Sequence, residues 1–236
     1  MIKYANAAVK NLYNNPSTRI EVMLCLDKSG SMKNYGKIQQ LNNGIKLFYD
    51  SIKNDEYTVC SAEIAIVTFG EFPAAARCVR DFSTVDLQED PPELVADGYT
   101  PLGEGVNLAL DLIEKRKAQY KANGVSYYRP ILIIMSDGKP EGHDPAELTR
   151  AYTRVAEMTS QKKVLLLPIS IGTEDNPALA AFMNGQVFHM KDGCFKDFFS
   201  WLHKSVSDDV AKTPGEELDF QNLLKSALSW STDFSK

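Results

Sequence analysis

The sequence lacks several features that would assign it to a common functional class. Its 236 residues contain no run of about eighteen consecutive apolar residues, so no membrane-spanning helix is expected. Residues 1–15 have no uninterrupted apolar stretch with a small-residue cleavage site, so a secretory leader is not expected either. Basic residues do not exceed acidic ones, 26 against 31, and no long basic run occurs. This balance argues against nucleic acid or an anionic membrane as the main partner.

Cysteine and histidine are scarce, and their spacing suits neither a zinc site nor a disulfide framework. The four cysteines, Cys25, Cys60, Cys78 and Cys194, are widely separated and form no CxxC pair. The three histidines are scattered along the chain. We therefore expect reduced thiols in a cytoplasmic protein, and no metal site built from Cys and His.

Apolar runs alternate with helical stripes along most of the chain. Strands are predicted over residues 20–26, 61–69, 76–82, 129–135, 163–171 and 186–190, with the third at an edge. Helices are predicted over residues 38–53, from Thr100-Pro101 (as N-cap and first helical position) to about 113, over 146–161, and near 195–205. This alternation predicts a mainly parallel sheet covered on both faces, with ligand sites at the carboxyl ends of its strands.

The length suits one α/β domain with short appendages. We predict an N-terminal extension with a short helix over residues 1–18, the domain over 19–205, and a C-terminal tail over 206–236. The tail contains a predicted helix whose apolar stripe is Leu218, Leu224, Leu228 and Trp230. We expect this stripe to be buried, on the domain itself or in a partner.

The residues most informative about function follow the first predicted strand. Asp27, Ser29 and Ser31 form a DxSxS pattern, in which alternate side chains of an extended loop aim one carboxylate and two hydroxyls at one point. Thr100 and Asp137 stand at two other strand or loop ends, on the same predicted edge of the sheet. Each residue alone is an ordinary turn or cap residue. Turn formation does not require their convergence, so we predict a shared site.

The predicted site contains only oxygen donors, which favours a hard divalent cation over zinc. Mg²⁺ is the first choice, with Mn²⁺ or Ca²⁺ as alternatives, because Mg²⁺ takes six oxygens and retains several waters. The two carboxylates balance the charge of the ion, while the neutral hydroxyls leave it electrophilic towards one more anion. An Asp or Glu carboxylate of a partner protein is the expected anion.

In order and spacing, these five residues resemble the metal-ion-dependent adhesion site (MIDAS) of the von Willebrand factor A (vWA) domain family. The similarity spans about residues 18–204, and ADGYTPLGEGVNLAL and RPILIIMSDGKP are similar to segments of bacterial TerY-like proteins of tellurium-resistance operons. The resemblance implies a three-layer, doubly wound, Rossmann-like α/β fold, whose mainly parallel central sheet has one antiparallel edge strand. It also implies that Ser29 and Ser31 bind the metal directly, and that Asp27, Thr100 and Asp137 bind it directly or through water.

The expected function is a non-enzymatic, metal-dependent protein-protein interaction module, acting as an adaptor in tellurium resistance or stress signalling. The operons of the TerY-like relatives imply a kinase or a phosphatase as partner. Five residues near the predicted ion are expected to set partner selectivity: Lys28, Met32, Glu71, Tyr99 and Lys139.

Two other functions fit the same residues. One is a Mg²⁺-dependent phosphoester hydrolase, which needs a general base near the metal; Glu71, Glu104 and His143 are the candidates. The other is a vWA adaptor subunit of an ATPase or chelatase assembly. A phosphate-binding loop over residues 30–37 is not supported, because Ile38 stands where that motif requires Ser or Thr.

Overall fold

A six-stranded sheet forms the centre of the molecule, in the order β3-β2-β1-β4-β5-β6. The computed structural model describes residues 15–71, 75–172, 175–191 and 193–210. The strands are β1 (Ile20–Asp27), β2 (Ala62–Gly70), β3 (Ala75–Thr84), β4 (Ile131–Ser136), β5 (Leu165–Ile171) and β6 (Phe188–Met190). Neighbouring strands are parallel except β2 and β3, which are antiparallel. The predicted fold class, with its antiparallel edge strand, is confirmed.

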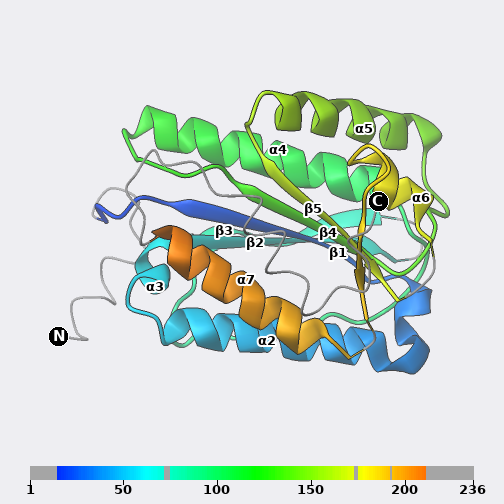
Figure 1. The fold of residues 1–236 in the computed structure, drawn as a ribbon, viewed down its shortest axis with the longest axis horizontal. Helices are drawn as coiled ribbons and strands as arrows, with labels where there is room; N and C mark the ends of the chain where they lie inside the picture. The colour runs from blue at the N-terminus through cyan, green and yellow to red at the C-terminus, as the bar shows by residue number, and fades with distance from the viewer. Residues whose placement is uncertain (1–14, 72–74, 173–174, 192, 211–236) are drawn as a thin grey trace.

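Helices cover both faces of the sheet (Figure 1). On one face lie α2 (Lys37–Lys53), α3 (Thr58–Ser61) and α7 (Phe195–Val210), and on the other α4 (Leu102–Ala122), α5 (Pro145–Ser160) and α6 (Pro177–Ala181). A 3-10 segment, η1 (Gly30–Gly36), joins β1 to α2. No helix in the described part of the chain is long and apolar enough to cross a membrane.

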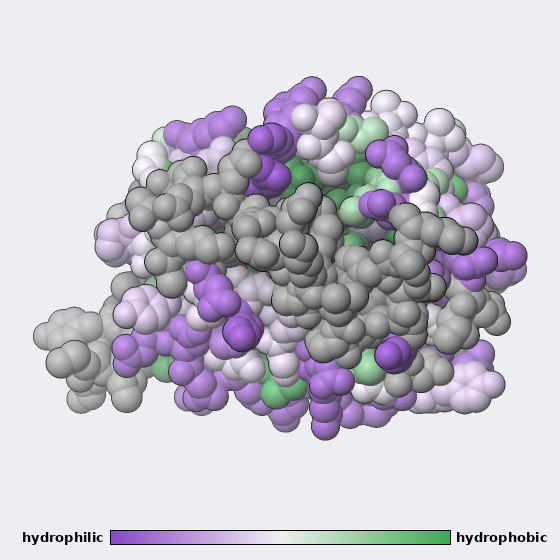
Figure 2. All heavy atoms as spheres, viewed as in Figure 1, coloured by the Kyte–Doolittle hydropathy of each residue, from purple (hydrophilic) through white to green (hydrophobic). Residues whose placement is uncertain are grey.

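Each face of the sheet has its own apolar core, because successive side chains of a strand point in opposite directions. Val22 and Leu24 of β1 belong to the core under α2 and α7, whereas Met23 and Cys25 belong to the core under α4 and α5. Burial on both faces explains why residues 22–26 of this strand form a continuous apolar run. Figure 2 shows that hydrophilic residues predominate on the outer side of α2, along the lower edge of the molecule.

Helices α2 and α7 pack closely because Gly44 of α2 has no side chain. A Cβ atom at this position would lie 2.5 Å from the ring of Phe199 in α7. That ring also contacts Phe48 of α2, with ring centroids 5.8 Å apart. The pair of helices therefore forms one continuous layer beneath the sheet.

Most predicted elements are present, with ends that shift by a few residues. The prediction for Thr100 and Pro101 was wrong: α4 begins at Leu102 with Pro101 as its N-cap residue, and Thr100 instead forms an antiparallel bridge with Glu141. Helix α7 continues to Val210, past residue 205. All four cysteines are free thiols. The helices predicted within 1–18 and in the tail, with its stripe of Leu and Trp, lie outside the described residues.

Candidate metal centre

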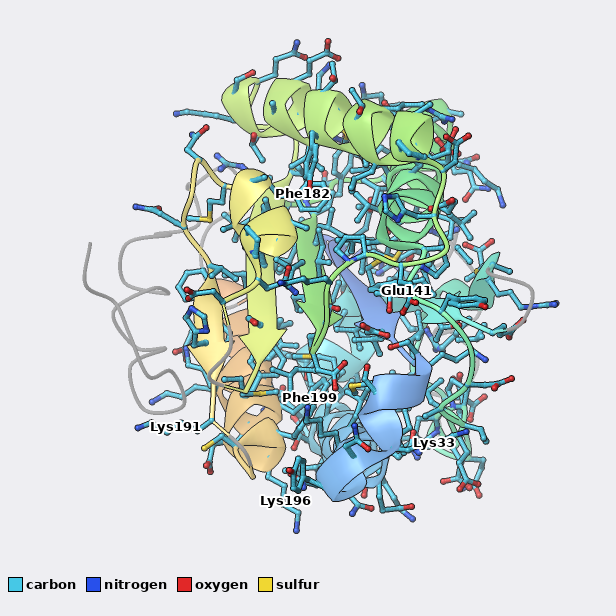
Figure 3. All side chains as sticks on the ribbon, turned by 90° about the vertical axis from the view of Figure 1, so that its right-hand side faces the viewer. Lys33, Glu141, Phe182, Lys191, Lys196 and Phe199 are labelled. Atoms are coloured by element: carbon cyan, nitrogen blue, oxygen red, sulfur yellow. The ribbon has the colours of Figure 1, made fainter. Side chains whose placement is uncertain are left out.

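The candidate site lies where β1 and β4 end, at the middle of the sheet. From β1 the chain crosses one face to β2, and it enters β4 from the other face, so these neighbours form a topological switch point, where α/β proteins place ligand sites. Leu26 pairs with Met135, which puts Asp27 next to Ser136. Figure 3 looks onto this edge of the sheet, and the labelled Lys33 and Glu141 lie on the segments that surround it.

Asp27 is the buried anchor of the site, with no exposed surface. Its Oδ1 accepts a hydrogen bond from the Ser29 backbone N–H at 2.7 Å, and its Oδ2 accepts one from the Ser136 hydroxyl at 2.5 Å. Burial raises the pKa of this carboxyl to about 6, although the hydrogen bonds from Ser136 and Ser29 lower it. Two donors therefore hold the carboxylate in a single orientation.

Three more oxygens follow in a continuous chain across two loops. Ser29 Oγ lies 3.0 Å from Ser31 Oγ, and the Ser31 hydroxyl donates to Asp137 Oδ1 at 2.6 Å. Ser29 is 2% exposed and the Asp137 side chain 1%. The site thus joins the loop after β1 to the loop after β4, as the sequence predicts for these residues.

The chemistry of these oxygens suits a hard divalent cation. Mg²⁺ and Mn²⁺ are hard cations that prefer oxygen ligands of this kind. The three oxygens are 3.0 and 2.6 Å apart because they are joined by hydrogen bonds, and this places them close enough to converge on one ion. Within the described residues, no group of three or more His, Cys, Asp or Glu could hold a metal. Any ion here therefore depends on the serine hydroxyls as well as the carboxylates.

A third loop, residues 97–100, lies against the loops after β1 and β2. Its Gly98 carbonyl accepts from the Gly30 N–H at 3.0 Å, and the Asp97 N–H donates to the Lys28 carbonyl at 2.7 Å. Gly98 has a φ of +69°, and a Cβ atom there would lie 1.8 Å from the carbonyl oxygen of Glu71. Only glycine allows this close approach of the two backbones.

Thr100 follows directly in this loop and is 5% exposed. Two backbone hydrogen bonds with Glu141, at 3.0 and 3.2 Å, tie it to the segment after β4. Among the described residues, its hydroxyl makes no hydrogen bond to the other four predicted site residues. The structure therefore links Asp27, Ser29, Ser31 and Asp137 through hydrogen bonds that involve their side chains, and connects Thr100 to them through the backbone.

Three residues at the site were not predicted from the sequence. Lys37 Nζ lies 2.8 Å from Asp137 Oδ2, and Ser136 donates to Asp27 as described. Asn176 Nδ2 donates to the Gly138 carbonyl at 2.7 Å, which supports the loop that carries Asp137. Only Ser136 had a usable signal, because it lies between the strand predicted over 129–135 and Asp137.

The residues expected to set selectivity have different environments. Lys28 Nζ is 2.8 Å from Glu71 Oε1, and Arg77 Nε is 2.6 Å from Glu71 Oε2. Tyr99 and Lys139 are exposed. The expectation for Met32 was wrong, because its side chain is fully buried in the core under α2 and cannot contact a partner.

Known proteins similar to this chain share one domain. The profile of the von Willebrand factor type A domain matches residues 22–139, half of the 236 residues. A von Willebrand factor type A structure from Catenulispora acidiphila is 22% identical, with a TM-score of 0.60, over 81% of this chain and 43% of that one. The vWF domain of the type V pili tip protein Mfa5 from Porphyromonas gingivalis is 10% identical, with a TM-score of 0.62, over 84% and 98%.

A third structure, the pilus adhesin SpaC from Lactobacillus rhamnosus GG in its open conformation, is 11% identical, with a TM-score of 0.60, over 84% of this chain and 31% of that chain. The TM-scores show that these structures share the fold of this chain. The chain spans less than half the length of the Catenulispora and Lactobacillus proteins. No curated protein sequence matches the chain significantly.

Proposed function

The chain belongs to the von Willebrand factor type A domain family, and on this basis we propose that it is a metal-dependent protein-interaction module. Domains of this family are typically interaction modules. The observation that carries the proposal is the chain of oxygens formed by Ser29, Ser31 and Asp137, drawn from two loops at the switch point of the sheet. Its oxygen-only chemistry fits a hard cation such as Mg²⁺ or Mn²⁺.

The residues of the site have different roles in holding the ion. Ser29, Ser31 and Asp137 offer the converging oxygens, while Asp27 is fixed behind them by its two hydrogen bonds. Thr100 is placed by its backbone bridge in the third loop. When bound, the ion supplies a coordination position that a carboxylate oxygen of a partner can fill. The protein then binds an Asp or Glu of another chain without chemical change.

The surface around the site supports an acidic partner. Lys33 and Lys139 are exposed on two of the surrounding segments, although the chain as a whole carries a net charge of −5. Tyr35 is 86% exposed in η1, and Tyr99 is 38% exposed beside Thr100. Exposed tyrosines are enriched on surfaces that bind other proteins, and the two lysines favour a partner of opposite charge.

At a finer level, we propose a cytoplasmic adaptor in tellurium resistance or stress signalling, with a kinase or phosphatase of the same operon as partner. The support is the similarity of residues 96–110 and 129–140 to TerY-like proteins. Co-purification of an ATPase instead would favour the role of an adaptor in an ATPase or chelatase assembly.

The structure offers little support for catalysis by Glu71, one of the three candidate bases. The carboxylate of Glu71 is paired with Lys28 and Arg77, and the hydrogen bond from Lys28 is the largest cause of its lowered pKa. A carboxylate stabilised in this way accepts a proton less readily. Turnover of a phosphoester panel with Mg²⁺ present, lost in Glu104→Gln or His143→Ala, would instead support the hydrolase.

The test measures metal binding first and partner binding second. Titration of the metal-free protein with Mn²⁺, followed by electron paramagnetic resonance, is expected to show one site that is lost in Asp27→Asn and Ser31→Ala. The exposed Asp90→Asn serves as matched control and is expected to bind normally. A pull-down from native lysate is then made with and without EDTA, and with Asp27→Asn. Equal recovery of the partner in every condition would refute a metal-bridged interaction.

A further inference from the structure

The carboxylate of Asp137 has both oxygens engaged by groups of its own chain. Oδ1 accepts the Ser31 hydroxyl, and Oδ2 lies 2.8 Å from Lys37 Nζ. The Asp137 side chain is 1% exposed and that of Lys37 is 15% exposed. Because the pair is largely shielded from water, its attraction is stronger than that of a surface ion pair. An ammonium group therefore neutralises a carboxylate of the proposed metal centre.

The position of Lys37 in its helix supports a specific role for this contact. Lys37 is the first residue of α2, and the first turn of this helix contains no acidic residue. A positive side chain at a helix N-terminus is disfavoured by the helix dipole. Its placement is compensated by Asp137, which comes from another loop a hundred residues away. The preceding turn, with Tyr35 and Gly36 both at positive φ, brings the chain back from the site into α2.

We propose that Lys37 sets the metal affinity of the site by competing with the cation for Asp137. This inference rests on the proposed metal-dependent function. A divalent ion that binds Asp137 must displace the ammonium or remain beside a positive charge, and both weaken its binding. The flexible four-carbon stem of lysine lets the ammonium move out towards solvent when it is displaced. The site therefore binds a divalent ion only at metal concentrations high enough to displace the Lys37 ammonium from Asp137.

Substitution of Lys37 tests this directly. Mn²⁺ titration of Lys37→Met is expected to give a Kd about tenfold lower than that of the wild type, because the competing charge is gone. Lys33→Met and Lys139→Met remove one positive charge from neighbouring exposed positions and control for long-range electrostatics. Both are expected to change the Kd by less than about twofold. Lys37→Arg keeps the charge and is expected to bind as weakly as the wild type.

A second measurement follows the ammonium itself. Amine-reactive labelling read by mass spectrometry is expected to modify Lys37 slowly in the metal-free protein and several times faster with saturating Mg²⁺. Labelling of Lys33 is expected to stay constant, and Asp27→Asn is expected to abolish the increase at Lys37. A Lys37 that labels equally with and without Mg²⁺ would overturn the inference.

The outcomes separate this inference from the proposed function. If the wild type binds Mn²⁺ through Asp27 but Lys37→Met binds no more tightly than Lys33→Met, the competition is refuted and the metal site stands. If wild type, Asp27→Asn and Lys37→Met all show the same uptake, or none, both proposals fail. Binding that is measurable only in Lys37→Met supports competition strongly.

Discussion

Asp27 depends on two donors for its buried carboxylate, and only one of them comes from its own loop. The Ser29 N–H is supplied by the local turn, whereas the Ser136 hydroxyl comes from the neighbouring strand β4. A buried carboxylate that loses a donor keeps the full penalty of being removed from water. The strand pairing thus helps to hold the metal centre in place.

Ser136→Ala is expected to lower the free energy of unfolding by about 1–3 kcal/mol, because it leaves Asp27 Oδ2 without its donor. Urea denaturation at pH 7 measures the change. The control is Ser160→Ala, whose hydroxyl donates to the Glu157 carbonyl at an exposed helix end. That variant is expected to stay within about 0.5 kcal/mol of the wild type. Equal stability of the two variants would contradict the assigned role of Ser136.

Glu21 presents a different case near the amino end of β1, away from the metal centre. Its side chain is fully buried, and neither carboxylate oxygen has a hydrogen-bond partner among the described residues. Burial raises the pKa of Glu21 from 4.5 to about 8, nearby Lys117 lowers it, and Glu63 raises it. The carboxyl is therefore protonated in the folded protein at neutral pH.

Glu21→Gln is expected to become more stable relative to the wild type as pH rises from about 4.5 to 8. In this window the unfolded wild type releases the Glu21 proton while the folded protein retains it, so the contribution of Glu21 to stability falls. The difference grows by up to about 1.4 kcal/mol per pH unit. Denaturation series at pH 5, 6.5 and 8 measure it. A difference that is constant across the three pH values would show that Glu21 does not titrate in this way.

Among the elements, the loops after β1 and β2 and the loop 97–100 act as one unit. Backbone hydrogen bonds join them at Lys28, Gly30, Glu71 and Asp97. Each of these contacts is made between backbone groups, so their formation does not depend on the identity of the side chains at Lys28, Glu71 or Asp97. The two backbones come closest at Gly98, where loop 97–100 lies directly against the backbone of Glu71.

Gly98→Ala is expected to be more destabilising than Gly124→Ala by roughly 1–3 kcal/mol. Both glycines have a φ near +65°, so both substitutions introduce backbone strain, but a Cβ at Gly124 meets nothing within 4 Å. The comparison isolates the collision with Glu71. Thermal denaturation measures stability, and Mn²⁺ titration is expected to show weaker binding only for Gly98→Ala. Equal stability and equal Mn²⁺ affinity of the two variants would mean that loop 97–100 moves away from Glu71 without an energetic cost.

For the molecule as a whole, the site exists only in the folded chain, because Ser31 and Asp137 are more than a hundred residues apart in sequence. A metal that binds there therefore stabilises the folded state. Mg²⁺ at a hundredfold excess over its Kd is expected to add about 2.7 kcal/mol. For a domain of this size that corresponds to a rise in Tm of about 5–10 °C.

Calorimetry with and without Mg²⁺ measures this rise. Asp27→Asn is expected to lose it, and Asp90→Asn is expected to keep it. A rise of the same size in both variants would show that Mg²⁺ acts elsewhere on the protein.

Predictions from the sequence succeeded where the pattern is local or strongly periodic. Asp27, Ser29 and Ser31 fall within five residues, so their convergence follows from one turn at the end of a strand. Predictions failed where tertiary packing overrides a local signal. Met32 lies beside the motif but is drawn into the core, and Thr100 pairs with Glu141 instead of capping α4.

The amino-acid sequence by itself determined the α/β class, the mainly parallel sheet and the position of the oxygen-rich motif at a strand end. These follow from the alternation of apolar runs and helical stripes, which is a short-range property of the chain. Only the tertiary structure decided that Lys37 faces Asp137 and that Ser136 holds Asp27. Both contacts join residues at least a hundred positions apart, and such partners are chosen by strand order, register and the packing of α2, which no local pattern specifies.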